Sequence, residues 1–488
     1  MPRAKKSNRQ GEELRTRVDS RYLIAFDEGE HKIVDRGVLV YEGNRVVYTG
    51  PHYDGPADET IDATDRIVAP GFISTHTHMG GSPFDRSLRE DVKDYWATGL
   101  YEILMPIRAA ATQAATEAAA RASSLELIRS GVTTAIDMSA WPEATVKSVE
   151  ESGLRAYIGQ YVRSSNWATD GVGISFVPVG EEEERRLVES SVAFIKRYLD
   201  DPDSRIKGMF APAQVDTCSP ELMREVHKLA GELDVPIQIH ASQSVAEFNE
   251  IMSRTGMTPV EYLRDVGILD SRLIVGHCLI ISGHSWLHYP MGDDLQILAD
   301  SGATVAHCPN VFVRHGQAME NFAEYRKRGV KVALGVDTTP QSMLMEMRLA
   351  GSIARVLTRS EMSATARHLF DMATLAGAAA LGRDDIGRLA PGSKADFVTY
   401  RTDTVTMSPL RDPIRNIVHS AGPADVDTVV IDGRTVLSDG KPTYADEQEI
   451  ARQVQEAAED VWEKFPEHHH SGRSVDDASP LGARLIKG

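Results

Sequence analysis

Four short apolar runs in this chain each end on side chains that can bind a metal ion. The residues at these ends are His76 and His78, then His240, His277 and Asp337. Side chains two positions apart on a strand point to the same face, so His76 and His78 can reach one ion. Four separate runs that all end in this way are hard to explain by chance. The pattern therefore predicts strands that bring these groups together around a metal.

Eight apolar runs of strand length alternate with helical stretches over about three hundred residues. The runs lie at 73–76, 133–137, 156–161, 206–210, 237–240, 273–277, 304–307 and 332–337. Helical stretches such as 109–130, 220–233 and 343–357 lie between them. This alternation indicates parallel βα units. We therefore expect an α/β protein built on a (β/α)8 TIM barrel, which carries its chemistry at the carboxyl ends of the strands.

A doubly wound open sheet is the competing architecture. It is disfavoured because no glycine-rich phosphate loop follows the first strand.

Both ends of the chain carry further strand-like runs, which predict a second and smaller module. We expect a disordered tail at 1–19 and a small β-sandwich formed by 20–70 and 390–445. The metal-binding barrel then spans 71–389, and a C-terminal helix and tail span 446–488. The tail contains three successive histidines, residues 468–470, which we interpret as solvated rather than as a metal site.

Charge and hydropathy exclude several classes of partner. The chain has 53 basic and 71 acidic residues and a formal charge of −18, which argues against nucleic acid or an anionic membrane surface as the main partner. No apolar run approaches the ~18–20 residues of a membrane span. The basic N-terminus lacks the apolar segment of a signal peptide. We expect a cytoplasmic enzyme, a homo-oligomer, that acts on a small molecule.

The chain has three cysteines, Cys218, Cys278 and Cys308. A small and odd number of cysteines disfavours a disulfide framework. Cys278 and Cys308 directly follow histidines at predicted strand ends. We interpret them as small buried residues rather than as nucleophiles.

The motifs as a set resemble the metal-dependent amidohydrolase superfamily. The resemblance is carried by residues 70–78, by His240 and His277, by the strand end at Asp337, and by the segments 372–382 and 387–397. It covers roughly residues 20–440. The chain is most similar to the branch of triazine hydrolases and nucleobase deaminases that also contains phenylurea hydrolase and molinate hydrolase.

The resemblance implies one divalent metal ion, bound by His76, His78, His240 and Asp337. Zinc is our first expectation from these nitrogen and oxygen ligands, and iron, cobalt or manganese would also fit. Asp337 and His277 are the expected catalytic residues. Asp337 would ligate the ion and accept a proton, and His277 would position the water or donate to the developing oxyanion.

Several positions depart from the pattern of the deaminases in this branch. Gln243 stands where they carry a glutamate, and Ala213 stands where they carry a histidine. Residues 311–312 and 341–342 replace the expected serine–asparagine pairs. A glutamine cannot shuttle protons near neutral pH. The pocket is therefore expected to be more apolar, with Gln243, His307, Arg163 and Trp167 as substrate-binding residues.

Three functions compete. Our first expectation is metal-hydroxide attack on an amide, urea or carbamate-type C–N bond of a small apolar compound, such as an N-aryl, phenylurea-like substrate. Gln243 favours this function. The alternative is a deaminase or dechlorinase of a nitrogen heterocycle. A ligand-binding or assembly protein on the same frame is the third, but every expected metal ligand is present.

Overall fold

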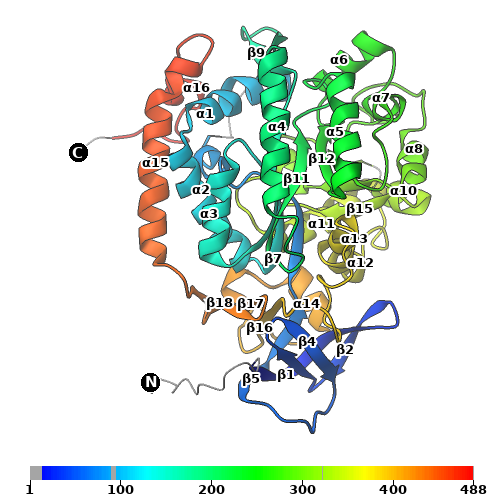
Figure 1. Ribbon diagram of the computed structural model, residues 1–488, viewed down its shortest axis with the longest axis vertical. Helices are drawn as coiled ribbons and strands as arrows, with labels where there is room; N and C mark the ends of the chain where they lie inside the picture. The colour runs from blue at the N-terminus through cyan, green and yellow to red at the C-terminus, as the bar shows by residue number, and fades with distance from the viewer. Residues whose placement is uncertain (1–13, 89–94, 321, 487–488) are drawn as a thin grey trace.

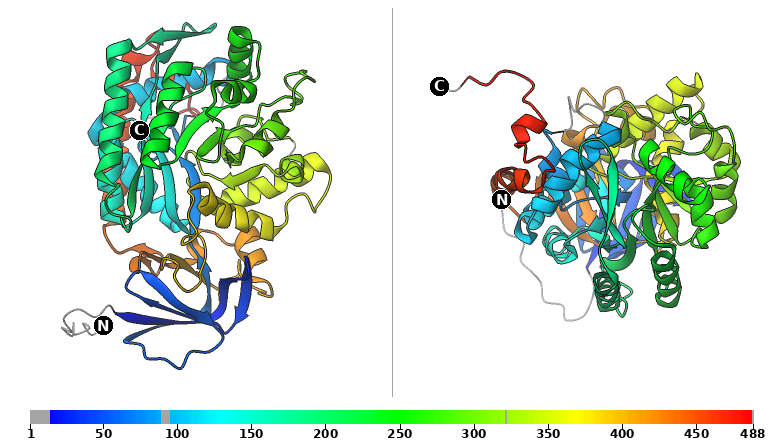
Figure 2. Two further views of the ribbon diagram at one scale, coloured as in Figure 1. Left: turned by 45° about the vertical axis from the view of Figure 1, so that its right-hand side comes forward. Right: turned by 90° about the horizontal axis from the view of Figure 1, so that it is seen from above.

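The computed structural model describes residues 14–88, 95–320 and 322–486, and its centre is a barrel of eight parallel strands. The strands are β6 (Phe72–Thr77), β7 (Val132–Ser139), β8 (Arg155–Val162), β11 (Ile206–Pro212), β12 (Ile237–Ala241), β13 (Leu273–His277), β14 (Thr304–His307) and β15 (Lys331–Leu334). Each neighbour in this series pairs in parallel with the next. The predicted TIM-type barrel is confirmed, and all eight predicted strands are present (Figures 1 and 2).

The backbone of the predicted metal ligands closes the barrel. The amide nitrogens of Val336 and Asp337 donate to the carbonyl of His76 over 3.1 and 2.9 Å, and the His78 nitrogen donates to the Asp337 carbonyl over 2.9 Å. Gly335 permits this approach, because a Cβ there would lie 2.9 Å from the His76 nitrogen and 2.8 Å from the Cys308 sulfur. The first and last strands therefore meet at the site itself.

Helices follow the strands, and most of them cover the outside of the barrel. They are α1 (Met105–Ala110), α2 (Gln113–Arg129), α3 (Pro142–Ser152), α4 (Glu181–Arg197), α5 (Pro220–Leu233), α6 (Val245–Thr255), α7 (Pro259–Val266), α8 (Asp294–Ser301), α9 (Pro309–Val313), α10 (Phe322–Arg328), α11 (Met343–Thr358), α12 (Ala366–Ala373), α13 (Leu375–Ala380) and α14 (Pro413–His419). Several begin at a side-chain cap, as α5 does at Ser219, whose hydroxyl accepts from the Leu222 nitrogen.

Two short insertions lie at the carboxyl ends of the strands. The segment after β6 contains a 3-10 turn, η1 (Ser82–Asp85), and a π-helix, η2 (Tyr95–Leu104). The segment after β8 forms an antiparallel hairpin from β9 (Ser165–Thr169) and β10 (Ile174–Pro178). A further 3-10 turn, η3 (Pro423–Asp425), precedes β17.

Strands from both termini form a second sheet at the opposite end of the barrel (Figure 1). They are β1 (Arg15–Asp27), β2 (Glu30–Asp35), β3 (Val38–Glu42), β4 (Arg45–Gly50), β5 (Glu59–Pro70), β16 (Phe397–Arg401), β17 (Val426–Ile431), β18 (Arg434–Ser438) and β19 (Lys441–Pro442). The predicted module from both termini is confirmed. Its strands are hydrogen-bonded as one sheet rather than two, because β5 pairs with β1 on one side and β16 on the other.

The exact domain bounds stay a prediction, with one correction at the N-terminus. Strand β1 begins at Arg15, so residues 15–19 are not part of a disordered tail. Their alternating burial places Thr16 and Val18 inside the sheet. Residues 1–13 lie outside the described part of the chain.

The C-terminal segment begins with a helix that packs along the barrel and ends in exposed residues, 481–486, that extend away from it (Figure 2). Helix α15 (Glu447–His468) buries Val461 and Phe465 against Ile107 of α1 and Ala119 of α2. The indole nitrogen of Trp462 donates to the Phe84 carbonyl over 2.9 Å. A short helix, α16 (Val475–Ala478), follows. Among the described helices, none has the length and apolar character needed to cross a membrane.

Candidate metal centre

Four histidines and one aspartate meet at the carboxyl ends of the barrel strands. His76 belongs to β6, His240 to β12 and His277 to the end of β13, while His78 and Asp337 lie just beyond β6 and β15. The Asp337 carboxylate lies 3.5 Å from His277 Nε2, 3.6 Å from His78 Nε2 and 3.9 Å from His76 Nε2. His78 Nε2 and His240 Nε2 are 3.2 Å apart. The sequence-predicted ligands therefore surround one point.

All four imidazoles are buried and are held neutral by that burial. Burial lowers the pKa of His76 to about 4 and the pKa of His240 to about 3. It also holds the pKa of His78 and of His277 well below the ordinary value. A neutral imidazole offers a nitrogen lone pair, which is the form that a metal ion binds.

Hydrogen bonds at the far ring nitrogens orient three of these imidazoles. His76 Nδ1 lies 3.1 Å from the Gln238 side-chain oxygen, and His240 Nδ1 lies 2.6 Å from the Ala213 carbonyl. His78 Nδ1 lies 3.3 Å from the Met138 carbonyl. Donation through Nδ1 leaves each Nε2 as the ligand atom, the usual arrangement behind metal-bound histidines.

The donor set fits a divalent metal ion. His76 Nε2 and both ring nitrogens of His277 are buried and have no hydrogen-bond partner among the described residues, although buried polar atoms are normally paired. Nitrogen and carboxylate oxygen ligands suit zinc and its neighbours in the first transition row. The residues present thus match the expected ion on the geometry of this site alone.

A cavity of about 470 Å3 opens onto the metal centre. Three of the four predicted substrate-binding residues, Gln243, Arg163 and Trp167, line it. The apolar replacements Ala213 and Val311 line it too, and the Phe312 ring lies 4.6 Å from the His277 ring. The volume is that of a pocket for a small molecule.

His307 is not among the lining residues of this cavity, and its role as a substrate-binding residue stays a prediction. Its ring stacks on Phe322 of α10 at 6.0 Å, and burial lowers its pKa to about 4. The aromatic partner comes from outside the strand, so the strand-end position alone does not reveal where this ring goes. The cysteines are all buried and free of disulfides, as predicted.

The Gln243 amide belongs to a fixed loop. Its side-chain oxygen accepts from Gln214 Nε2 over 3.2 Å, and its carbonyl accepts from Gln317 Nε2 over 3.3 Å. The buried Glu247 carboxylate accepts from the Ser242 nitrogen over 2.5 Å. These three hydrogen bonds fix the loop that carries Gln243, which follows His240 by three positions.

Tyr161 and Arg108 are two of the cavity residues that reasoning from the sequence misses. The Tyr161 hydroxyl lies 2.9 Å from His78 Nδ1, and Tyr161 lines the cavity. It precedes Arg163 by two positions, so the period of a strand could have indicated it. Arg108 lines the cavity from α1. It sits in the insertion after β6, and no motif marks it.

Comparisons with known proteins agree with this geometry. A model described as the amidohydrolase family matches residues 67–436. The 5'-deoxyadenosine deaminase of Methanothermobacter thermautotrophicus is 33% identical over 408 residues, which cover 82% of this chain and 89% of that protein. A 5-methylthioadenosine/S-adenosylhomocysteine deaminase of Thermococcus kodakarensis is 32% identical and covers 83% of this chain and 91% of its own length.

Two solved structures share the fold at lower identity. A zinc-bound adenosine deaminase from Xanthomonas campestris has a TM-score of 0.80 at 20% identity and covers 92% of this chain and 99% of its own. A glutamate-to-glutamine variant of atrazine chlorohydrolase from Arthrobacter aurescens, complexed with zinc and atraton, has a TM-score of 0.78 at 22% identity. That match covers 91% of this chain and all of the other.

The chain belongs to the amidohydrolase family. It is a metal-dependent amidohydrolase of the kind that acts on carbon–nitrogen bonds other than peptide bonds. The two curated relatives are deaminases, so they do not support the finer resemblance to phenylurea and molinate hydrolases.

Proposed function

We propose that this enzyme hydrolyses the exocyclic C–N bond of a planar nitrogen heterocycle and releases ammonia or an amine. The observation that carries the proposal is an intact His76, His78, His240 and Asp337 cluster in a chain that aligns with heterocycle deaminases over most of its length. It is the alternative among the functions that the sequence indicates, rather than the first expectation. We further propose zinc as the ion and a homo-oligomer in the cytoplasm as the working form.

His76, His78, His240 and Asp337 would hold the proposed ion. When bound, a divalent ion would supply a water molecule with a pKa lowered toward neutrality. Since the imidazoles are neutral, Asp337 is the one anionic member of this set. Its carboxylate is therefore the group that takes the proton of the attacking water and returns it to the departing nitrogen.

His277 lies beside Asp337 and takes the second catalytic role. Its Nε2 lies 3.5 Å from the Asp337 carboxylate, and the Phe312 ring packs against its face. A neutral imidazole in this position would hydrogen-bond the attacking water and hold it toward the ring carbon. Its burial among apolar and aromatic atoms keeps bulk water from competing for that bond.

The cavity walls suit a flat ring. Trp167 is fixed by a hydrogen bond of 3.0 Å from its indole nitrogen to the buried Asp216, and its ring meets Tyr101 edge-on at 5.0 Å. Leu104 and Met105 add apolar surface. Burial of a heterocycle against these walls contributes about 25 cal/mol per Å2 of apolar area.

A second candidate function is hydrolysis of an acyclic amide or urea, and Gln243 favours it. Deamination of a heterocycle uses a proton carrier for the ring nitrogen, and an amide cannot fill that role, so Asp337 would have to protonate the ring nitrogen in the first candidate. Attack on a carbonyl needs no ring protonation, so Asp337 alone can serve. Position 243 is thus the residue that separates the two candidates.

A substrate panel on metal-analysed enzyme tests both. The first arm contains 5'-deoxyadenosine, adenosine, cytosine, guanine and melamine, with ammonia as the readout. The second arm contains N-aryl ureas, anilides and carbamates, with arylamine as the readout. We expect turnover in the first arm that falls by roughly 10²–10⁴-fold in Asp337→Asn. Turnover confined to the second arm would replace the proposal with the second candidate, and no turnover in either would refute both.

A further inference from the structure

A second group of metal-type ligands lies outside the cavity. Glu102 of η2 and the two residues that follow α15, His469 and His470, place one ligand atom each within 4.8 Å of one another. The sequence alone favours a solvated histidine run at this point. That interpretation is wrong for His469, which is 5% exposed.

The two imidazoles are held in place by their own segment. The His469 ring packs on Phe465 at 5.3 Å and on the His470 ring at 4.5 Å. The Ser471 nitrogen donates to His469 Nδ1 over 3.2 Å, and the Ser471 hydroxyl, 3.2 Å from the same atom, can accept the Nδ1 proton when Nε2 binds an ion. His469 Nε2 is buried and has no hydrogen-bond partner among the described residues. A buried polar atom without a partner calls for a ligand.

A third segment approaches the same point. Gly171, in the turn between β9 and β10, has a φ of +86°, and a Cβ there would lie 2.9 Å from the His470 ring and 3.8 Å from the Glu102 carboxylate. Asp170 precedes it, with a carboxylate held by the nitrogens of Val172 and Gly173 at 2.9 and 3.0 Å. These backbone hydrogen bonds are the main reason that the pKa of Asp170 is lowered, and His470 adds to the effect.

We propose that Glu102, His469 and His470 form a second divalent-cation site that ties the C-terminal segment to the wall of the cavity. Two imidazoles and a carboxylate suit zinc, cobalt or nickel rather than calcium or magnesium. Water fills the remaining positions, since His470 is exposed.

The location gives the site a structural task. Leu100 and Leu104 of η2 line the cavity, and Glu102 lies between them in the sequence. Residues two apart on a helix face different sides, so the ligand and the lining residues belong to different faces of η2. An ion bound by Glu102 would therefore connect the outer face of η2 to the segment that follows α15, on the side of η2 away from the cavity.

The test uses the full chain with zinc in its catalytic site, and three variants. Glu102→Gln and the double variant His469→Ala/His470→Ala remove ligands. His468→Ala is the matched control, because His468 is exposed and lies outside the cluster. Bound zinc is measured by mass spectrometry after equilibration and desalting, and cobalt uptake is followed by its visible absorption.

We expect about two zinc ions per chain in the wild type and His468→Ala, and about one in the other two variants. Binding of the second zinc ion should raise Tm in the wild type and in His468→Ala, and not in the two ligand variants. The single ion kept by the ligand variants shows that they are folded, and a zinc content in them equal to wild type would overturn the proposal. Loss in His468→Ala as well would also overturn it. None of these readouts depends on the substrate.

Discussion

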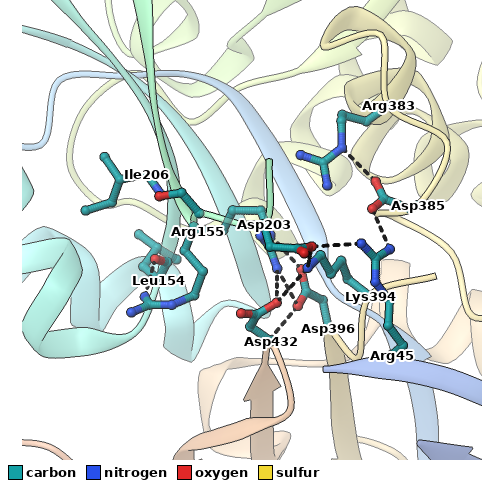
Figure 3. A network of polar contacts seen from close by, with 12 residues as sticks. Arg45, Leu154, Arg155, Asp203, Ile206, Arg383, Asp385, Lys394, Asp396 and Asp432 are labelled. Atoms are coloured by element: carbon teal, nitrogen blue, oxygen red, sulfur yellow. Dashed lines mark hydrogen bonds and ion pairs between the residues drawn. The ribbon is translucent and has the colours of Figure 1, made fainter. Parts of the chain in front are cut away.

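Two buried polar clusters lie at opposite ends of the barrel and are built on different principles. At the base, Arg155 donates to Asp396 at 3.0 and 3.2 Å and to Asp432 at 3.0 Å, with the Arg155 and Asp396 side chains each 1% exposed (Figure 3). Lys394 contacts Asp432 at 3.4 Å and Asp203 at 2.7 Å. At the mouth, neutral imidazoles surround Asp337 and keep nitrogen atoms that no described residue pairs with.

This difference in pairing indicates that the base cluster stabilises the fold, whereas the cluster at the mouth binds a ligand. Each carboxylate drawn at the base has a cationic neighbour, and the network joins β8 to the terminal sheet through Asp396 and Asp432. The residues at the mouth are equally buried, but there one carboxylate, Asp337, faces four imidazoles. Burial lowers the pKa of each imidazole and keeps it neutral. Neutral ring nitrogens that stay without a hydrogen bond under such burial are ligand positions that a bound ion can satisfy.

The largest expected effect is loss of the metal. His240→Ala removes one ligand at the centre of the cluster, and bound metal and turnover should both fall to background at the catalytic site. Metal analysis, turnover and Tm measured together would check this. Full turnover in His240→Ala would contradict the claim that the cluster at the mouth binds a catalytic metal.

Asp337→Asn should reduce turnover by roughly 10²–10⁴-fold, the usual range for loss of a general base. The amide keeps the size of the side chain and can still ligate weakly, so part of the metal should stay bound. The kcat of the variant relative to wild type, measured across pH, checks the effect. Near-normal kcat at every pH would show that another group carries the proton.

At the base, the expected effect is on stability and not on chemistry. Arg155→Met leaves Asp396 buried without its cation, which costs about 3–5 kcal/mol in the free energy of unfolding. Arg186→Met is the matched control, because its pair with Glu183 lies on the surface with the two side chains 62% and 42% exposed and should contribute little to stability. Denaturant unfolding of the two variants measures the contrast, and equal losses would contradict it.

The smallest effect concerns a buried histidine outside both clusters. Burial lowers the pKa of His31 to about 4, and its Nε2 lies 3.1 Å from the Thr374 hydroxyl. Because the unfolded chain binds a proton near pH 6.5 and the folded chain does not, stability is lost as pH falls from about 6.5 toward 4. The loss should reach about 1–3 kcal/mol and be smaller in His31→Gln, as unfolding at several pH values would reveal. An identical pH dependence in both proteins would argue against a neutral buried His31.

The sequence was sufficient for features encoded within single strands. An apolar run and the ligand that ends it lie next to each other in the chain, which is why His76, His240 and Asp337 can be assigned from the sequence alone. Features that depend on distant segments cannot be assigned in this way. His307 turns toward Phe322, Arg108 reaches the cavity from an insertion, and Glu102 meets His469 across 367 positions (469 − 102).

Reconstitution of the metal-free enzyme tests the central claim most directly. The chain is stripped with a chelator and then titrated with zinc, while turnover of the best substrate from the panel and bound zinc are followed together. The Glu102→Gln variant is included so that zinc bound outside the cavity does not enter the count. We predict that turnover returns in proportion to zinc and reaches a plateau near one ion per chain in that variant. Full turnover in the stripped enzyme, or a plateau unaffected by His240→Ala, would contradict a catalytic metal at the mouth of the barrel.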